Sequence, residues 1–69
     1  MRGHGIITAW NTDRGFGFIR RDDGARDLFC HAKDLPYGMG ALEVGQPVRF
    51  NISAHRDGRE RASDVELAR

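Results

Sequence analysis

The sequence has few of the features that hold many small domains together. Its 69 residues include one cysteine, Cys30, so no disulfide can form within the chain. A domain of this length buries only about 60% of the surface that its unfolded chain exposes, so we expect marginal stability. We therefore predict a single domain over residues 1–69, with a core from about 5 to 67, that folds by packing alone in a reducing cytoplasm.

Long apolar runs and an excess of one charge are also missing. No stretch approaches the roughly 20 apolar residues that cross a bilayer, so we expect no membrane segment. Met1–Gly5 carries a charge but no apolar run follows it, so we expect no signal peptide. Eleven basic residues face ten acidic ones, giving a net charge of +1. This balance argues against a nucleic-acid binder that relies on charge alone.

Short apolar runs with alternating polarity are present instead, separated by glycine and Asp-Gly pairs. This pattern predicts strands rather than helices, and five such runs indicate an all-β fold, a small antiparallel barrel or sandwich. The predicted strands are Ile7–Trp10, Phe16–Ile19, Leu28–Cys30, Val48–Ile52 and Val65–Leu67.

The connections between these strands differ in kind. Asp23-Gly24 and Asp57-Gly58 each predict a hairpin, because Asp-Gly favours the type I′ turn with positive φ at both central residues. The stretch from Ala32 to Gly45 is too long for a tight turn. It predicts a crossing loop with one helical turn near Lys33-Asp34.

Alternation along the strands assigns side chains to two faces of the sheet. The aliphatic positions supply the inward face of a barrel: Ile7, Ile19, Leu28, Cys30, Val48, Phe50, Ile52 and Val65. Three phenylalanines and a histidine are then left on the outward face: Phe16, Phe18, Phe29 and His31. So much exposed apolar area on a small protein points to a ligand.

Exposed rings on adjacent strands predict a surface for single-stranded nucleic acid. Bases stack on such rings with about 1–3 kcal/mol each and little regard to sequence. Trp10 has a parity opposite to that of Ile7 and is expected to join the rings. Gly15 and Gly17 are expected to leave space beside Phe16 for a base. Four arginines cluster near these strands and are candidates for phosphate contacts: Arg14, Arg20, Arg21 and Arg26.

Two segments resemble the motifs of a known family. Arg14-Gly15-Phe16-Gly17-Phe18-Ile19 closely resembles the first ribonucleoprotein motif of cold-shock domains, K-G-F-G-F-I, and Leu28-Phe29-Cys30-His31 resembles the second, V-F-V-H. The resemblance runs from about Gly5 to Val65. It implies a five-stranded antiparallel barrel of the OB type that binds single-stranded RNA and DNA, often as an RNA chaperone. We therefore expect an RNA chaperone or a regulator of transcription or translation.

The resemblance also carries site residues. It implies nucleic-acid contacts by Phe16, Phe18, Phe29 and His31, by Trp10 and Asn11, and by Tyr37 as a substitute for the usual loop aromatic. Arg14 is a candidate from its place in the first motif. Arg56, Arg59 and Arg61 either extend the binding surface or only meet solvent, and we include Arg61 among the predicted contacts.

The sequence departs from the family at several positions. Ala9 and Ala32 stand where aromatic residues are usual, and Arg59-Glu60 replace a Gly-Pro pair. Two missing stacking partners, at about 1–3 kcal/mol each, predict weaker binding or a shorter footprint than in a typical member. We also expect binding of both RNA and DNA, with modest salt dependence.

A second interpretation is a protein-interaction or self-association module with weakened nucleic-acid binding. We expect a monomer, with a weak dimer as the alternative. The histidines and Cys30 lack zinc spacing, so we expect no metal and no cofactor. Cys30 and His31 are neighbours on one strand and therefore point to opposite faces. We predict no catalytic site, and no enzyme.

Overall fold

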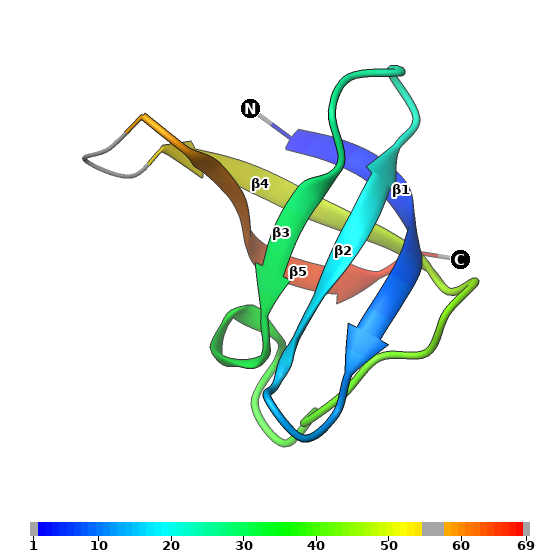
Figure 1. Ribbon diagram of the computed structural model, residues 1–69, viewed down its shortest axis with the longest axis vertical. Coiled ribbons are helices and arrows are strands. Elements are labelled where there is room, and N and C mark those ends of the chain that lie inside the picture. Colours follow the sequence, from blue (N-terminus) through cyan, green and yellow to red (C-terminus); the bar gives the residue numbers. More distant parts are fainter. Residues whose placement is uncertain (1, 55–57, 69) are drawn as a thin grey trace.

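Strand β1 (Arg2–Asn11) takes part in two ladders of the computed structural model, which describes residues 2–54 and 58–68. Its first half pairs with β4 (Pro47–Ala54) and its second half with β2 (Phe16–Arg21). The remaining strands are β3 (Leu28–His31) and β5 (Glu60–Leu67). The order β1-β2-β3-β5-β4 closes into a barrel, with β2 and β3 side by side in Figure 1. The predicted all-β, five-stranded barrel of the OB type is confirmed.

One ladder of the barrel is parallel, which the prediction of an antiparallel barrel did not include. β3 and β5 run in the same direction, with Phe29 opposite Arg61, whereas the other four ladders are antiparallel. The reason is geometric. Five strands cannot alternate in direction all the way around a closed barrel, so one neighbouring pair must be parallel.

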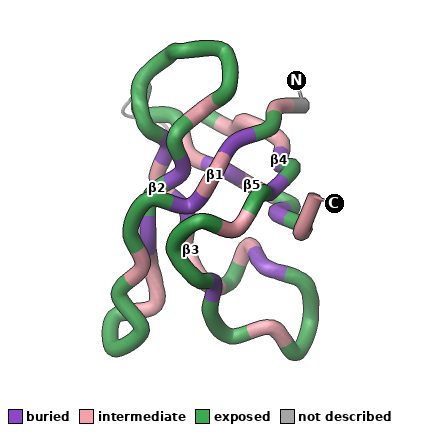
Figure 2. The backbone as a smooth tube through the Cα atoms, turned by 90° about the vertical axis from the view of Figure 1, so that its right-hand side faces the viewer, coloured by how far each residue is buried: buried purple, intermediate pink, exposed green. Residues whose placement is uncertain are grey.

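The core lies inside the barrel and is almost entirely apolar. Among the described residues no polar or charged side chain is buried. The predicted inward set is buried except for Ile52, which is half-buried and packs against the core. Three buried apolar side chains of the core were not predicted: Leu35, Leu42 and Ala62. Leu35 and Leu42 come from the crossing loop, which Figure 2 shows as mostly exposed with buried stretches between.

The turn between β2 and β3 is wider than predicted. Residues 22–27 form the loop, and Gly24 has a φ of 78° while Asp23 does not have a positive φ. Asp23 instead accepts a hydrogen bond from the Ala25 amide through its carboxylate (2.9 Å). The hairpin is therefore present but its predicted type I′ geometry is wrong, because an Asx-type bond stabilises a longer loop. In the second predicted hairpin, Asp57 lies outside the described residues.

The crossing loop contains the predicted helical turn. A 3-10 helix, η1, spans Ala32–Asp34, and the amide of Leu35 donates to the carbonyl of Ala32 (3.1 Å). The loop is joined to the β1–β2 turn at one point, where the Ala32 amide donates to the carbonyl of Gly15 (2.8 Å). This bond places the start of the loop beside the first residues of β2 and the last residues of β3.

Candidate functional site

The outer face of β2 and β3 carries four rings that touch one another, which we call the aromatic patch: Phe16, Phe18, Phe29 and His31. The strand register produces it, because Phe16 lies opposite His31 and Phe18 lies opposite Phe29. Residues directly opposite in an antiparallel pair have Cβ atoms only about 5 Å apart. The predicted outward placement of all four rings is thus confirmed, while their contact with nucleic acid stays a prediction.

The rings of the patch are arranged at differing angles. Phe16 and Phe29 are stacked, with ring centres 5.6 Å apart and planes inclined by 29°. Phe18 meets both rings edge-on, at 6.3 and 6.0 Å. It is 38% exposed, whereas the other three are half-buried because they cover one another. Phe18 therefore offers the most accessible ring, and the patch is held in shape before any ligand arrives.

His31 has a defined hydrogen-bonding state. Its Nδ1 accepts a hydrogen bond from the amide of Lys33 (3.1 Å), which caps the start of η1. A nitrogen that accepts cannot carry the proton, so in the neutral ring the proton lies on Nε2. The ring therefore presents an N–H donor away from η1, next to Phe29 at a ring distance of 6.4 Å. This donor can recognise an acceptor atom on a base edge or a phosphate.

Trp10 does not join the aromatic patch, and its predicted placement is wrong. The β1–β2 register shifts between Ile7 and Ala9, so that Ala9 lies opposite Phe18 and Trp10 lies opposite Gly17. Trp10 therefore faces the same side as the core and packs against it. A bulge adds one residue and reverses the parity of everything after it. Sequence parity alone contains no signal of this shift.

The role predicted for Gly17 changes for the same reason. Gly17 is buried on the inner side, and a Cβ added there would stand 2.5 Å from the Trp10 ring and clash with the Ala9 carbonyl oxygen. Its missing side chain makes room for the indole, not for an incoming base. Gly15, with a φ of 73°, serves the β1–β2 turn.

Asn11 and Arg14 meet in the β1–β2 turn at one end of the patch. Asn11 lies opposite Phe16, and its Oδ1 accepts a hydrogen bond from the Arg14 amide (3.0 Å). Asn11 thus fixes the turn, and it is exposed. Arg14 is exposed. Both residues lie at the Phe16 end of the patch, and their contact with nucleic acid stays a prediction.

The other predicted arginines separate into two groups. Arg20 and Arg26 are exposed, and Arg20 shares the outward parity of Phe18. Arg21 instead lies at the end of the barrel, with its side chain 11% exposed and ion pairs to Asp23 (3.3 Å) and Glu60 (3.6 Å). Arg21 therefore joins the β2–β3 loop to β5. Sequence reasoning missed Glu60 as its partner, because β2 and β5 are far apart in the chain.

Arg61 and Tyr37 occupy very different surroundings. Arg61 lies opposite Phe29, beside the patch, but its guanidinium pairs with Asp34 of η1 at 3.6 Å and is 21% exposed. Tyr37 is fully exposed in the crossing loop, and within residues 2–54 and 58–68 no ring contact joins it to the patch. The structure brings Arg61 to the site and leaves Tyr37 outside it. Arg56, considered with Arg61, lies outside the described residues.

Cys30 is buried on the inner face of β3, opposite Gly17. Burial, with a smaller contribution from the charge of Asp34, raises the pKa of the Cys30 thiol from 9.0 to about 11. A thiol with so high a pKa is a poor nucleophile at neutral pH. Over the described residues, no three His, Cys, Asp or Glu side chains gather in a way that could hold a metal ion, and no helix could span a membrane.

Comparison with known proteins identifies the family of this chain. The 'Cold-shock' DNA-binding domain model matches residues 3–68. The chain is 38% identical over 66 residues to cold shock protein CspA of Rhizobium meliloti, covering 93% of this chain and 96% of that protein. It is 36% identical over 64 residues to cold shock-like protein CspG of Escherichia coli K12, covering 91% of each. This chain therefore belongs to the cold-shock domain family.

Other relatives are much longer than this chain. Glycine-rich protein 2 of Nicotiana sylvestris is 38% identical over 66 residues, which cover 94% of this chain but only 31% of that protein. Cold shock protein 1 of Arabidopsis thaliana is matched over 22% of its length. The chain thus spans a third or less of these plant proteins, and what it shares with them is the domain.

Proposed function

We propose that this protein binds single-stranded RNA or DNA by stacking bases on the aromatic patch, and that it acts as an RNA chaperone. The observation that carries the proposal is the outward placement of three phenylalanines on β2 and β3 above a complete apolar core. None of these rings is needed to fill the barrel. Stacking on each is worth about 1–3 kcal/mol, and it is tolerant of sequence because every base has a π-face.

The mechanism is passive binding rather than catalysis. Bases that leave a hairpin stack on the patch, which keeps the strand open, and each weak contact allows easy release. His31, whose ring lies beside Phe29, and Asn11, which lies opposite Phe16, supply hydrogen bonds to base edges or phosphates through Nε2 and Nδ2. Membership of a family described as a DNA-binding domain supports this function.

Stacking can be tested with a fluorescein-labelled oligothymidine and an RNA of equal length, followed by anisotropy at low salt. Phe18→Ala and Phe29→Ala should each weaken binding by roughly 5- to 150-fold, the equivalent of about 1–3 kcal/mol. Val44→Ala is the matched control, because Val44 is also an exposed apolar residue (66%) but lies in the crossing loop. Equal affinities for all three variants would refute the proposal.

The alternative is a patch that docks a protein or a second copy of the chain. Ala9, opposite Phe18 on the outer face, motivates it, because a small residue there reduces the area available for bases. This alternative expects association of the protein with itself in light scattering, weakened by Phe18→Ala, together with no oligonucleotide binding. The proposed function expects a monomer under the same conditions.

A further inference from the structure

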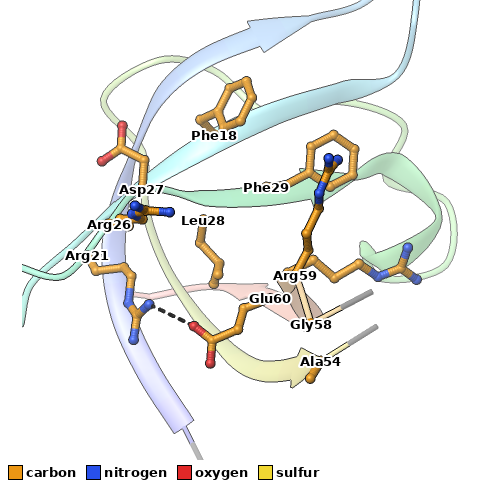
Figure 3. Close-up of a pocket in the computed structure, with 11 residues that line it drawn as sticks. Phe18, Arg21, Arg26, Asp27, Leu28, Phe29, Ala54, Gly58, Arg59 and Glu60 are labelled. Atoms are coloured by element: carbon orange, nitrogen blue, oxygen red, sulfur yellow. Dashed lines mark ion pairs between the residues drawn. The ribbon is translucent and has the colours of Figure 1, made fainter. Parts of the chain in front are cut away.

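A groove of about 840 Å³ opens directly beside the aromatic patch. Phe18 and Phe29 form its upper side in Figure 3, and the ion pair between Arg21 and Glu60 lies across from them. One side of the groove comes from the β2–β3 loop and the other from the start of β5. The two phenylalanines belong to both the patch and the groove, so the two surfaces are continuous.

The groove is lined by more positive than negative side chains. Four arginines contribute to it against two carboxylates: Arg21, Arg26, Arg59 and Arg61 against Asp27 and Glu60. The side chains of Arg21 and Arg61 are only 11% and 21% exposed, and they pair with Glu60 and Asp34 respectively. Their charges are therefore compensated within the fold.

Arg26 and Arg59 are the exposed arginines of the groove. They reach it from opposite sides, Arg26 from the β2–β3 loop and Arg59 from the residue before β5. Within the described part of the chain, Arg26 makes no hydrogen bond or ion pair with any side chain. A pair of guanidinium groups across an open groove suits an anion with several oxygens, because each offers a planar fork of donors.

We propose that this groove binds the phosphodiester backbone of nucleotides that flank those stacked on Phe18 and Phe29. The inference rests on the proposed function, since the same strand must occupy the patch. A strand whose bases cover these two rings has to continue past the edge of the patch, and the groove with Arg26 and Arg59 begins at that edge. The ligand at this second surface is the charged backbone, so it is read without regard to base identity.

The test separates charge from stacking through salt dependence. For single strands, the slope of log K against log salt is about −0.7 for each phosphate that is neutralised. The affinity for a seven-nucleotide oligothymidine is measured from 50 to 200 mM salt. The magnitude of the slope should be smaller by about 0.7 in Arg26→Ala, by a similar amount in Arg59→Ala, and by the sum of the two in the double variant. For each arginine that is removed, the loss of affinity caused by raising the salt over this range should become roughly threefold smaller.

Two controls isolate the groove. Arg49→Ala removes the same charge from β4, which pairs with neither β2 nor β3, and should leave the slope unchanged. Replacing both groove arginines by lysine keeps the charge and should retain most of the slope, which shows that the effect follows the positive charge. Phe29→Ala should lower the affinity at every salt concentration and leave the slope as it is.

The possible results distinguish a failure of the groove proposal from a failure of the proposed stacking function. If the double alanine variant keeps the slope of the unaltered protein while Phe29→Ala weakens binding, the groove does not hold the backbone and the stacking function stands. If the slope falls equally in Arg49→Ala, the effect belongs to net charge and the groove is again refuted. If no oligonucleotide binds the unaltered protein, both proposals fail together.

Discussion

Trp10 lies opposite Gly17 on the inner side of the β1–β2 ladder, and its indole occupies the space that any side chain at Gly17 would need. The two residues pack together on the inner side of the sheet whose outer face carries the aromatic patch. The only tryptophan of the chain is therefore a packing residue, and the outward position next to Phe18 is held by Ala9.

Ala9→Trp should strengthen binding. Ala9 is exposed and lies directly opposite Phe18, so a tryptophan there extends the aromatic surface across β1. One more stacked base is worth about 1–3 kcal/mol, or roughly 5- to 150-fold in Kd for oligothymidine by anisotropy. Thr12→Trp, in the exposed β1–β2 turn, is a control that adds the same ring outside the strands. No gain in Ala9→Trp would mean that bases do not reach this side of Phe18.

Trp10→Phe should leave binding almost unchanged, within about twofold, because a ring on the inner face does not stack with a base. The buried Nε1 of Trp10 has no hydrogen-bond partner among the described residues. Losing an unsatisfied donor offsets part of the lost packing, so the free energy of unfolding should change by less than about 1 kcal/mol. Urea titration and anisotropy measure the two effects. A Kd that rises more than tenfold would place the indole in the interface after all.

Gly17→Ala should destabilise the barrel by about 1–3 kcal/mol or more, because the new methyl group meets both the Trp10 ring and the Ala9 carbonyl oxygen. Gly40→Ala serves as control, since a Cβ there meets nothing within 4 Å and φ is not positive. Thermal unfolding should show a clearly lower Tm for the first variant alone. Equal Tm values would show that the β1–β2 register can adjust to admit a side chain.

The effects of replacing Arg61 and Asp34 on the free energy of unfolding should not be additive. Their side chains are only 21% and 14% exposed, so Arg61→Ala leaves a carboxylate with little access to water and should cost about 1–3 kcal/mol. A double-mutant cycle with Asp34→Ala should return a coupling energy of about 0.5–3 kcal/mol. The Arg49–Glu66 pair is about half exposed on both sides, and the same cycle there should give less than about 1 kcal/mol.

Cys30 should make the stability fall with rising alkaline pH. Its pKa is raised in the folded protein to about 11 from 9.0, so the folded state holds the proton more tightly than the unfolded state. The contribution is therefore complete below pH 9 and is lost as the pH rises from about 9 to 11, a change of about 2–3 kcal/mol. Urea titrations at several pH values measure this slope. Cys30→Val removes the titrating group and should flatten the curve over this interval.

The sequence by itself determined which residues face inward and outward on β2 and β3. Alternation over Phe16–Ile19 and Leu28–Cys30 fixed both faces, because successive strand residues point to opposite sides and only one side can be buried in so small a barrel. The two motifs and the turn glycines then indicated the family and the five-stranded barrel. The outward placement of Phe16, Phe18, Phe29 and His31 followed from local pattern alone.

Only the tertiary structure decided what depends on contacts between distant segments. The bulge after Ile7 reverses the parity of Trp10, and closure of five strands requires one parallel pair, which here places Phe29 opposite Arg61. The ion pairs of Arg21 with Glu60 and of Arg61 with Asp34 join elements more than 25 residues apart. Such partners leave no trace in a local pattern, because register and closure are set by the packing of the whole barrel rather than by any single strand.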